Sequence, residues 1–268
     1  MMKNTFFRLS FLLLLAVPVL CLTACKVEPN LPADPHIPLV NTFIGVWLAE
    51  DGKYWEFRTD GTGGRADAEE GPFSDDFSFL FFDGKGPEEA GENIAPPSLV
   101  IIEGSPVTVT CYKFSIENNR AVLSEFSIDN NNKRIFSGSS ITMEQISGEP
   151  QVISLTNQLI GEWSVEWTGT HNPTGTLIWS IKYYADGTVK TYHHGFHQFE
   201  NAYALHGNTL VIFGAWRFSF VPIIADISQL EDGTFQATET QLSIEPYALG
   251  GWAYAGWVYT KVDTAQWK

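Results

Sequence analysis

Three histidines lie close together in the stretch YYADGTVKTYHHGFH, residues 183–197. Histidine nitrogens are common zinc ligands, so metal binding is the first chemistry that this spacing suggests. If residues 188–198 form one strand, however, a rise of about 3.3 Å per residue places His193 and His197 roughly 13 Å apart, too far to share one zinc ion. A bulge at Gly195 would bring them closer. We therefore predict structural roles for these histidines, with metal binding as the alternative.

Other sequence patterns that mark catalytic sites are weak or absent. The glycine-rich stretch GTGG at 61–64 belongs to a predicted hairpin and carries no lysine, so it does not match a phosphate-binding loop. The sequence contains no HExxH pair, and no serine has the flanking glycines of a nucleophile elbow. We expect no cofactor and no catalysis, with a metal-dependent hydrolase as a minor alternative.

Aromatic residues are concentrated in the second half of the chain, where they are candidates for contact with a ligand. Large side chains fill the core of a small barrel, which is one explanation for them. The alternative is an open cup in which flat rings stack on a lipid, a tetrapyrrole or a sugar. In the stretch GGWAYAGWVYT at 250–260, small residues alternate with rings and would leave room for a ligand. The candidate ligand-binding residues are Trp179, Tyr183, Trp252, Tyr254 and Trp257.

The N-terminus carries a secretory signal. Lys3 and Arg8 precede a short apolar run that ends in small residues, which is the pattern of a signal peptide. Residues 22–25, Leu-Thr-Ala-Cys, resemble the lipobox of bacterial lipoproteins, which implies cleavage after residue 24 and lipidation of Cys25. Several acyl chains together anchor a protein stably. We expect a signal peptide at 1–24, a lipidated cysteine with a Pro-rich tether at 25–40, and a position in the bacterial envelope. Lys26 after the cysteine favours the outer membrane.

Charge and cysteine content exclude some classes of partner and site. Without Lys3 and Arg8, 14 Lys and Arg face 31 Asp and Glu, so 14 − 31 gives a net charge of −17. A nucleic-acid partner requires a basic surface and is not expected. With Cys25 lipidated and Cys21 in the signal, Cys111 has no partner for a disulfide. We predict that Cys111 is a buried, unreactive thiol in a strand.

After residue 40 the chain contains two copies of one plan. Short apolar and aromatic segments recur in the same order and at similar spacing, so we predict two related domains at 41–150 and 151–268. The matching segments are FIGVW at 43–47 with LIGEW at 159–163, and YWEFRTDGTGG at 54–64 with SIKYYADGTVK at 180–190.

Both copies have the sequence pattern of antiparallel β-structure. Short β-branched and aromatic runs alternate with turn signals such as Asp60-Gly61 and Asp186-Gly187. Eight consecutive strands suit a small antiparallel β-barrel, and a sandwich is the alternative. We predict an all-β fold of two tandem barrels. In the second half the predicted strands are 160–168, 175–185, 188–198, 201–206, 209–215, 217–226, 234–241 and 252–262.

Each copy begins with Gly-x-Trp and later carries an Asp-Gly-Thr hairpin after an aromatic strand, as in bacterial lipocalin-like domains. The resemblance implies a calycin-type barrel with a ligand cup. The first copy departs from the family pattern through acidic, Gly/Pro-rich loops within 68–97, which leaves the completeness of its barrel open. The motifs are Gly45-Val46-Trp47 with Asp60-Gly61-Thr62, and Gly161-Glu162-Trp163 with Asp186-Gly187-Thr188.

These features favour a membrane-anchored lipoprotein that binds a small apolar or amphipathic ligand without catalysis, centred on the second domain. The alternative is an interaction protein that uses acidic loops, especially residues 66–97, against a protein partner.

Overall fold

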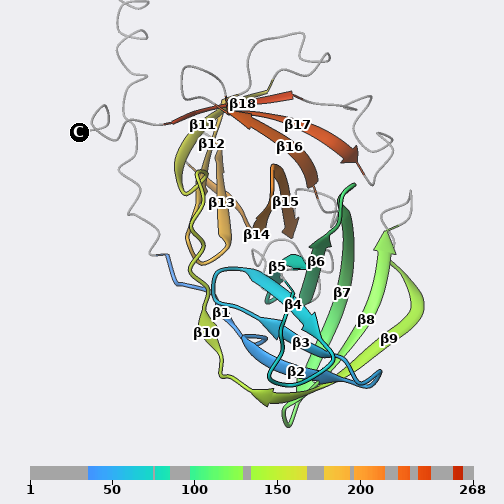
Figure 1. The fold of residues 1–268 in the computed structure, drawn as a ribbon. Coiled ribbons are helices and arrows are strands. Elements are labelled where there is room, and N and C mark those ends of the chain that lie inside the picture. Colours follow the sequence, from blue (N-terminus) through green and yellow to red (C-terminus); the bar gives the residue numbers. More distant parts are fainter. Residues whose placement is uncertain are drawn as a thin grey trace, which may run out of the picture. The chain divides into compact units, whose positions relative to one another are not determined.

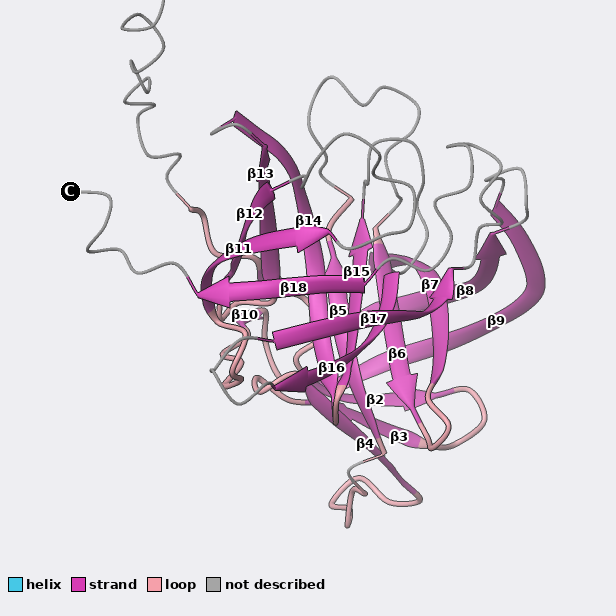
Figure 2. Cartoon of the chain, turned by 90° about the horizontal axis from the view of Figure 1, so that it is seen from above, coloured by secondary structure: helices cyan, strands magenta, loops and turns pink. Residues whose placement is uncertain are grey.

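The computed structural model describes residues 36–74, 76–84, 97–128, 134–167, 178–193, 196–214, 223–229, 235–242 and 256–261. Every regular element within these ranges is a β-strand (Figure 2). The chain divides into the units Met1–His36 and Ile37–Lys268, and all the strands belong to the second unit. No helix in the described part of the chain is long and apolar enough to cross a membrane.

The strands form two closed antiparallel barrels, each of eight strands in sequence order (Figure 1). The prediction of an all-β fold with two tandem barrels is confirmed. The first barrel contains β2 (Gly45–Ala49), β3 (Tyr54–Phe57), β4 (Thr62–Ala66), β5 (Phe77–Phe82), β6 (Ser98–Glu103), β7 (Thr108–Glu117), β8 (Arg120–Ile128) and β9 (Arg134–Ser147). The second contains β11 (Gly161–Trp167), β12 (Ile178–Tyr183), β13 (Thr188–His193), β14 (Phe196–His206), β15 (Thr209–Gly214), β16 (Ile223–Gln229), β17 (Phe235–Leu242) and β18 (Gly256–Lys261).

The first barrel is complete despite its acidic loops. It closes where β2 pairs with β9, and β4 pairs with β5 through the two residue pairs Thr62↔Ser78 and Gly63↔Phe77. Outside the barrels, β1 (Val40–Asn41) pairs with β10 (Gln151–Val152), which joins the segments that precede β2 and β11.

One predicted strand boundary in the second barrel is wrong. β13 ends at His193 and β14 begins at Phe196, so the chain reverses between them and not after residue 198. The ladder pairs His193 with Phe196 and Tyr192 with His197. The prediction placed residues 188–198 in one continuous strand, because apolar and aromatic residues continue on both sides of the histidines. His193 and His197 therefore lie on neighbouring strands, and their predicted separation along one strand does not apply.

The two Gly-x-Trp motifs have the same structure. Trp47 Nε1 donates to the carbonyl oxygen of Phe43 at 2.8 Å, and Trp163 Nε1 donates to that of Leu159 at 2.6 Å. Both indoles are fully buried, and both motifs begin with a glycine at positive φ, 127° and 132°. A residue with a side chain rarely adopts this conformation, which explains why each motif begins with glycine. We call the end of each barrel that contains its Gly-x-Trp motif the closed end of that barrel.

The two Asp-Gly-Thr hairpins also match. Asp60 Oδ1 accepts from the backbone N–H and hydroxyl of Thr62 at 2.9 and 2.7 Å, and Asp186 Oδ1 accepts from those of Thr188 at 3.1 and 2.7 Å. The environments differ, because Asp186 is buried and its Oδ2 also accepts from the backbone N–H of Leu39 at 2.8 Å. The second hairpin is thereby tied to the segment that enters the first barrel.

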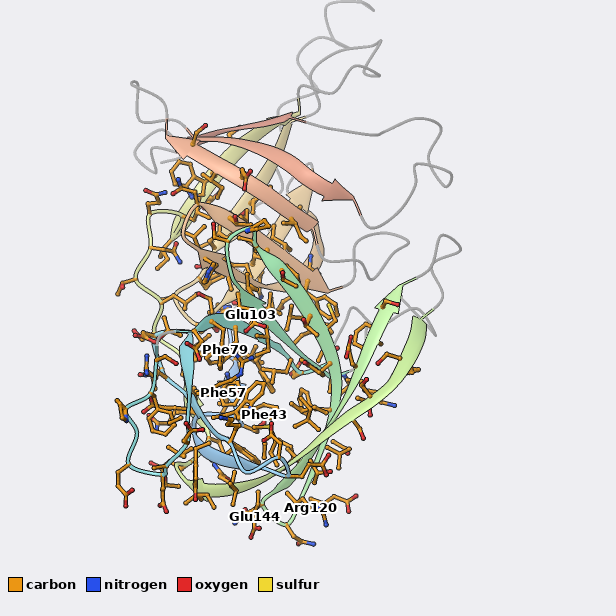
Figure 3. All side chains as sticks on the ribbon, turned by 45° about the vertical axis from the view of Figure 1, so that its right-hand side comes forward. Phe43, Phe57, Phe79, Glu103, Arg120 and Glu144 are labelled. Atoms are coloured by element: carbon orange, nitrogen blue, oxygen red, sulfur yellow. The ribbon has the colours of Figure 1, made fainter. Side chains whose placement is uncertain are left out.

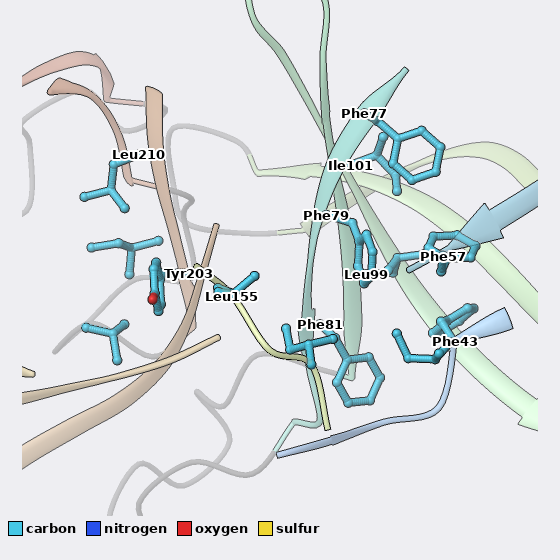
Figure 4. Packing of buried hydrophobic residues seen from close by; sticks show 14 of the residues in the cluster. Phe43, Phe57, Phe77, Phe79, Phe81, Leu99, Ile101, Leu155, Tyr203 and Leu210 are labelled. Carbon is cyan, nitrogen blue, oxygen red and sulfur yellow. The ribbon is translucent and has the colours of Figure 1, made fainter. Parts of the chain in front are cut away.

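The connection between the barrels packs on both hairpins. Ser154 N donates to Thr59 O at 2.5 Å, and Leu155 N donates to Ala185 O at 2.7 Å. A methyl group of Leu155 lies 2.5 Å from the position that a Cβ on Gly61 would take, and one of Ile153 lies 2.7 Å from the corresponding position on Gly187. Figure 4 shows Leu155 between Tyr203 of the second barrel and the phenylalanines of the first. The connection therefore joins the two interiors into one apolar cluster.

The barrels also share an apolar wall. All six residues of β5 are buried, and so are all six of β15, because one face of each strand points into its own barrel and the other packs against the neighbouring barrel. Phe82 of β5 contacts Phe213 of β15 edge-to-face, with ring centroids 6.0 Å apart. Cys111 lies in this wall, which confirms the predicted buried thiol in a strand, and burial raises its pKa to about 12.

Candidate functional site

The closed end of the first barrel is filled with aromatic rings. Phe43 contacts Trp47, Phe57, Phe81 and Phe114, with ring centroids 5.0 to 6.3 Å apart. Edge-to-face and tilted contacts of this kind stabilise a core beyond the burial of area alone. The closed end is thus a solid apolar floor.

A polar cluster lies at the other end of the same barrel. Figure 3 shows Glu103 farther from Phe43 than Phe57 and Phe79 are. Six neighbouring strands, β3 to β8, each contribute one side chain. We call this set the Arg65 cluster; its members are Trp55, Arg65, Phe77, Glu103, Tyr112 and Glu125.

The strand register explains why these side chains meet. Residues directly opposite in an antiparallel ladder share a face of the sheet. Trp55 faces the barrel interior with the buried Phe57, and it pairs with Arg65. Phe77 pairs with Glu103 across β5 and β6, and Tyr112 pairs with Glu125 across β7 and β8. The same inward face of successive strands therefore carries the whole cluster.

Arg65 is the centre of the cluster. Its Nη1 donates to Glu103 Oε2 at 2.8 Å, and the guanidinium carbon lies 4.2 Å from the ring centroid of Trp55 and 5.0 Å from that of Phe77. The Arg65 and Glu103 side chains are 28% and 34% exposed, so they border solvent. Because a guanidinium carries five N–H donors, its bond with Glu103 leaves donors for another acceptor.

Trp55 carries a buried polar group without a partner. The residue is 6% exposed, and its Nε1 has no hydrogen-bond partner among the described residues. Leaving such a donor unsatisfied costs about 1–3 kcal/mol. The indoles of Trp47 and Trp163 are buried as well, but both donate to a carbonyl. Trp55 is therefore able to donate to an acceptor that the described residues of the barrel do not supply.

Tyr112 remains a hydroxyl donor at neutral pH. Burial raises the pKa of its hydroxyl and the nearby Glu125 raises it further, while Arg65 lowers it and Glu103 raises it. These influences place Tyr112 within electrostatic reach of three charged members of the cluster.

Apolar side chains next to Tyr112 are only partly buried. They are the inward side chains of Phe114 and Ile116 on the same strand and that of Ile141 on β9.

Acidic groups surround this end of the barrel. The β4–β5 loop follows Arg65 directly, and its Asp67, Glu69 and Glu70 are exposed. Lys53 in the β2–β3 turn forms an ion pair with Asp67. An anionic molecule that approaches the Arg65 cluster therefore meets negative charge first.

The second barrel has a neutral set of residues at the equivalent level. Counted from the matched hairpins and ladders, Ile181, Thr191, Asn201 and Gly214 take the places of Trp55, Arg65, Phe77 and Glu103. Thr191 and Asn201 are each 2% exposed, and Asn201 Oδ1 is a buried acceptor with no partner in the part of the chain that the structure describes.

The five predicted aromatic ligand contacts are placed unequally. Tyr183 is fully buried at the closed end of the second barrel, where its ring meets that of Tyr203 at 4.8 Å. The backbones of Trp179 and Trp257 lie in β12 and β18, paired with Val165 and Trp167 of β11. Trp252 and Tyr254 lie outside the described residues. A ligand-binding role for these five residues stays a prediction.

The predicted metal and lipid sites stay predictions as well. His193 and His197 are placed by their backbones alone, on β13 and β14. Within the described ranges, no group of three or more His, Cys, Asp or Glu residues is arranged to hold a metal ion. Cys25 lies outside those ranges.

The sequence analysis did not identify the Arg65 cluster. A local signal for part of it exists: the Asp60-Gly61 hairpin fixes the register of β3 and β4 and so sets Arg65 opposite the inward Trp55. A charged residue on the apolar face of a hairpin indicates a special environment. Glu103, Tyr112 and Glu125 join through long-range pairing, for which the sequence has no motif. Comparison with known proteins adds no assignment, because no family model and no curated protein matches this chain.

Proposed function

We propose that this protein binds a small amphipathic molecule in the first β-barrel, without catalysis. The observation that carries the proposal is the buried, unpartnered Trp55 indole N–H beside Arg65 and Glu103 on the inner face of the barrel. Ligand pockets combine apolar walls with a few polar groups that orient the ligand. Here the partly buried Phe114 and Ile141 offer apolar contact, and the Arg65 cluster offers polar groups.

The proposal includes a lipid anchor on the bacterial envelope. The basic start, the apolar run and Leu22-Thr23-Ala24-Cys25 support this part, together with the resemblance of the motifs to lipocalin-like lipoproteins. Acylation of Cys25 would hold the barrels at the membrane surface, where amphipathic molecules are concentrated. The outer membrane is the proposed location.

Native mass spectrometry of the purified protein, compared with the same sample under denaturing conditions, tests the binding proposal. We expect an additional mass that is lost on denaturation, or else uptake of the uncharged apolar dye N-phenyl-1-naphthylamine with increased fluorescence. An unliganded protein that also ignores the dye would contradict ligand binding. It would favour the second candidate, a protein partner for the exposed acidic loop that carries Glu69 and Glu70.

A further inference from the structure

The Arg65 cluster also indicates which chemical class of head group the ligand carries. This inference rests on the proposed ligand-binding function and adds to it. We propose that the cluster binds the uncharged head group of an amphiphile that bears hydroxyl or carbonyl oxygens, and that Trp55 Nε1–H donates to one of those oxygens.

The cluster first requires an acceptor for its donors. Trp55 Nε1 can only donate, and it is buried without a partner among the described residues. Arg65 retains N–H donors beyond the one bonded to Glu103, and the Tyr112 hydroxyl can donate as well. A cationic ammonium head group has no acceptor to offer these three groups. A hydroxyl, ester or amide oxygen does.

The net charge of the Arg65 cluster also limits the head group. Arg65 and Glu103 neutralise one another at 2.8 Å, so Glu125 leaves the cluster with a net negative charge. Glu69 and Glu70 add negative charge on the adjoining loop, whereas Asp67 is paired with Lys53. A carboxylate or phosphate head group would be repelled by these groups. A hydroxyl can instead accept from Trp55 and donate to a carboxylate, so a neutral head group satisfies both ends of the cluster.

The filled closed end determines the direction in which the ligand lies. The closed end is filled by Phe43, Trp47 and Phe57, so an alkyl chain cannot reach that depth. Phe114 of β7 belongs to this floor, since its ring centroid lies 5.0 Å from that of Phe43, but Phe114 and the inward Ile141 of β9 are only partly buried and so offer apolar surface at the top of the floor. We therefore place the chain of the amphiphile against β7 and β9, with its head group at Trp55 and Arg65.

Isothermal titration calorimetry with three amphiphiles of equal chain length tests the inference. The probes are 1-lauroylglycerol (neutral), dodecanoate (anionic) and dodecyltrimethylammonium (cationic), each below its micelle concentration. We expect 1-lauroylglycerol to bind tightest. Tightest binding of either charged probe would overturn the head-group assignment but leave ligand binding intact. If none of the three binds, the proposed function itself fails and the inference fails with it.

Three substitutions locate the head group. Trp55→Phe keeps a ring but removes the N–H, and we expect it to weaken 1-lauroylglycerol binding about tenfold. Glu125→Gln removes the repulsion and should improve dodecanoate binding several-fold. Glu144→Gln, an exposed acid that Figure 3 shows beyond Phe43 at the opposite end, is the matched control and should change neither value. Unchanged affinity in Trp55→Phe would contradict the assigned hydrogen bond.

Discussion

Arg65 in the first barrel and Thr191 in the second occupy the same place in the repeat, three residues after the threonine of the hairpin. Below this level the barrels are built alike, with a buried tryptophan that donates to a carbonyl four residues earlier. At this level they diverge: the first barrel has an ion pair and a donor, Trp55 Nε1, and the second has neutral side chains and an acceptor, Asn201 Oδ1, and neither the donor nor the acceptor has a partner among the residues that the structure describes. The residues at the closed end are therefore built alike in both barrels, while those at the level above it differ, and we propose that this level determines what a barrel binds.

Substitutions in the shared wall should destabilise both barrels, and they have the largest expected effect on the free energy of unfolding. Phe213→Ala and Phe82→Ala each remove a ring from the contact between barrels, so each should lower the free energy of unfolding by about 3–5 kcal/mol. Ile37→Ala is the control, since this residue is 79% exposed and should change stability by less than about 0.5 kcal/mol.

Urea unfolding followed by fluorescence and circular dichroism measures both values. We expect one coincident transition by the two probes, because the wall and the Ile153–Leu155 connection couple the barrels. Two separate transitions, with each substitution affecting one of them, would show that the barrels unfold independently.

Substitutions of tryptophan test the difference between the closed ends and the Arg65 cluster. Trp47→Phe and Trp163→Phe each leave a buried carbonyl without its donor, so each should cost about 1–3 kcal/mol and the two costs should be similar. Trp55→Phe removes a donor that has no partner, so in the absence of ligand it should cost clearly less. Equal losses for Trp55→Phe and Trp47→Phe in urea titrations would contradict the assignment of Trp55 as an unpartnered donor.

The hairpin aspartates of the two barrels differ in burial. Asp186→Ala removes the acceptor of the buried N–H of Thr188 and of the partly buried N–H of Leu39, so we expect a loss of about 1–3 kcal/mol. Asp60→Ala acts on an exposed turn and should cost about 1 kcal/mol or less, as a cap or turn bond does. Thermal unfolding of both variants checks the order, and a larger loss for Asp60→Ala would reverse it.

The smallest expected effect is the pH dependence due to Asp60. Burial alone would raise its pKa, but the hydrogen bonds from Thr62 and the charge of Arg58 outweigh burial and hold the pKa below the ordinary value of 3.8. A depressed pKa stabilises the fold above the unfolded value, and this contribution is lost as pH falls below 3.8 through the folded pKa. Asp60→Asn should therefore flatten the fall in urea midpoint between pH 5 and pH 3. An unchanged slope would contradict the role of these bonds.

Local patterns in the sequence were sufficient to predict the barrels. The repeat predicted that Trp47 and Trp163 would be equivalent, and both are fully buried and donate to a carbonyl four residues earlier. The shared wall was missed, although FSFLFF at 77–82 is a continuous apolar run of the kind typical of strands buried on both faces. The Arg65 cluster was largely beyond prediction because Glu103 and Tyr112 reach it through strand pairing across the barrel, which leaves no fixed spacing in the chain.

The most direct test of the account follows the indole 15N–1H resonances of the tryptophans during titration with 1-lauroylglycerol, with Trp55, Trp47 and Trp163 assigned by their phenylalanine variants. Trp47 and Trp163 already donate to carbonyl oxygens and serve as internal references. The account predicts that the Trp55 proton moves downfield as it gains an acceptor, while the two reference signals stay in place. A stationary Trp55 signal, or larger shifts at Trp47 or Trp163, would contradict ligand binding at the Arg65 cluster.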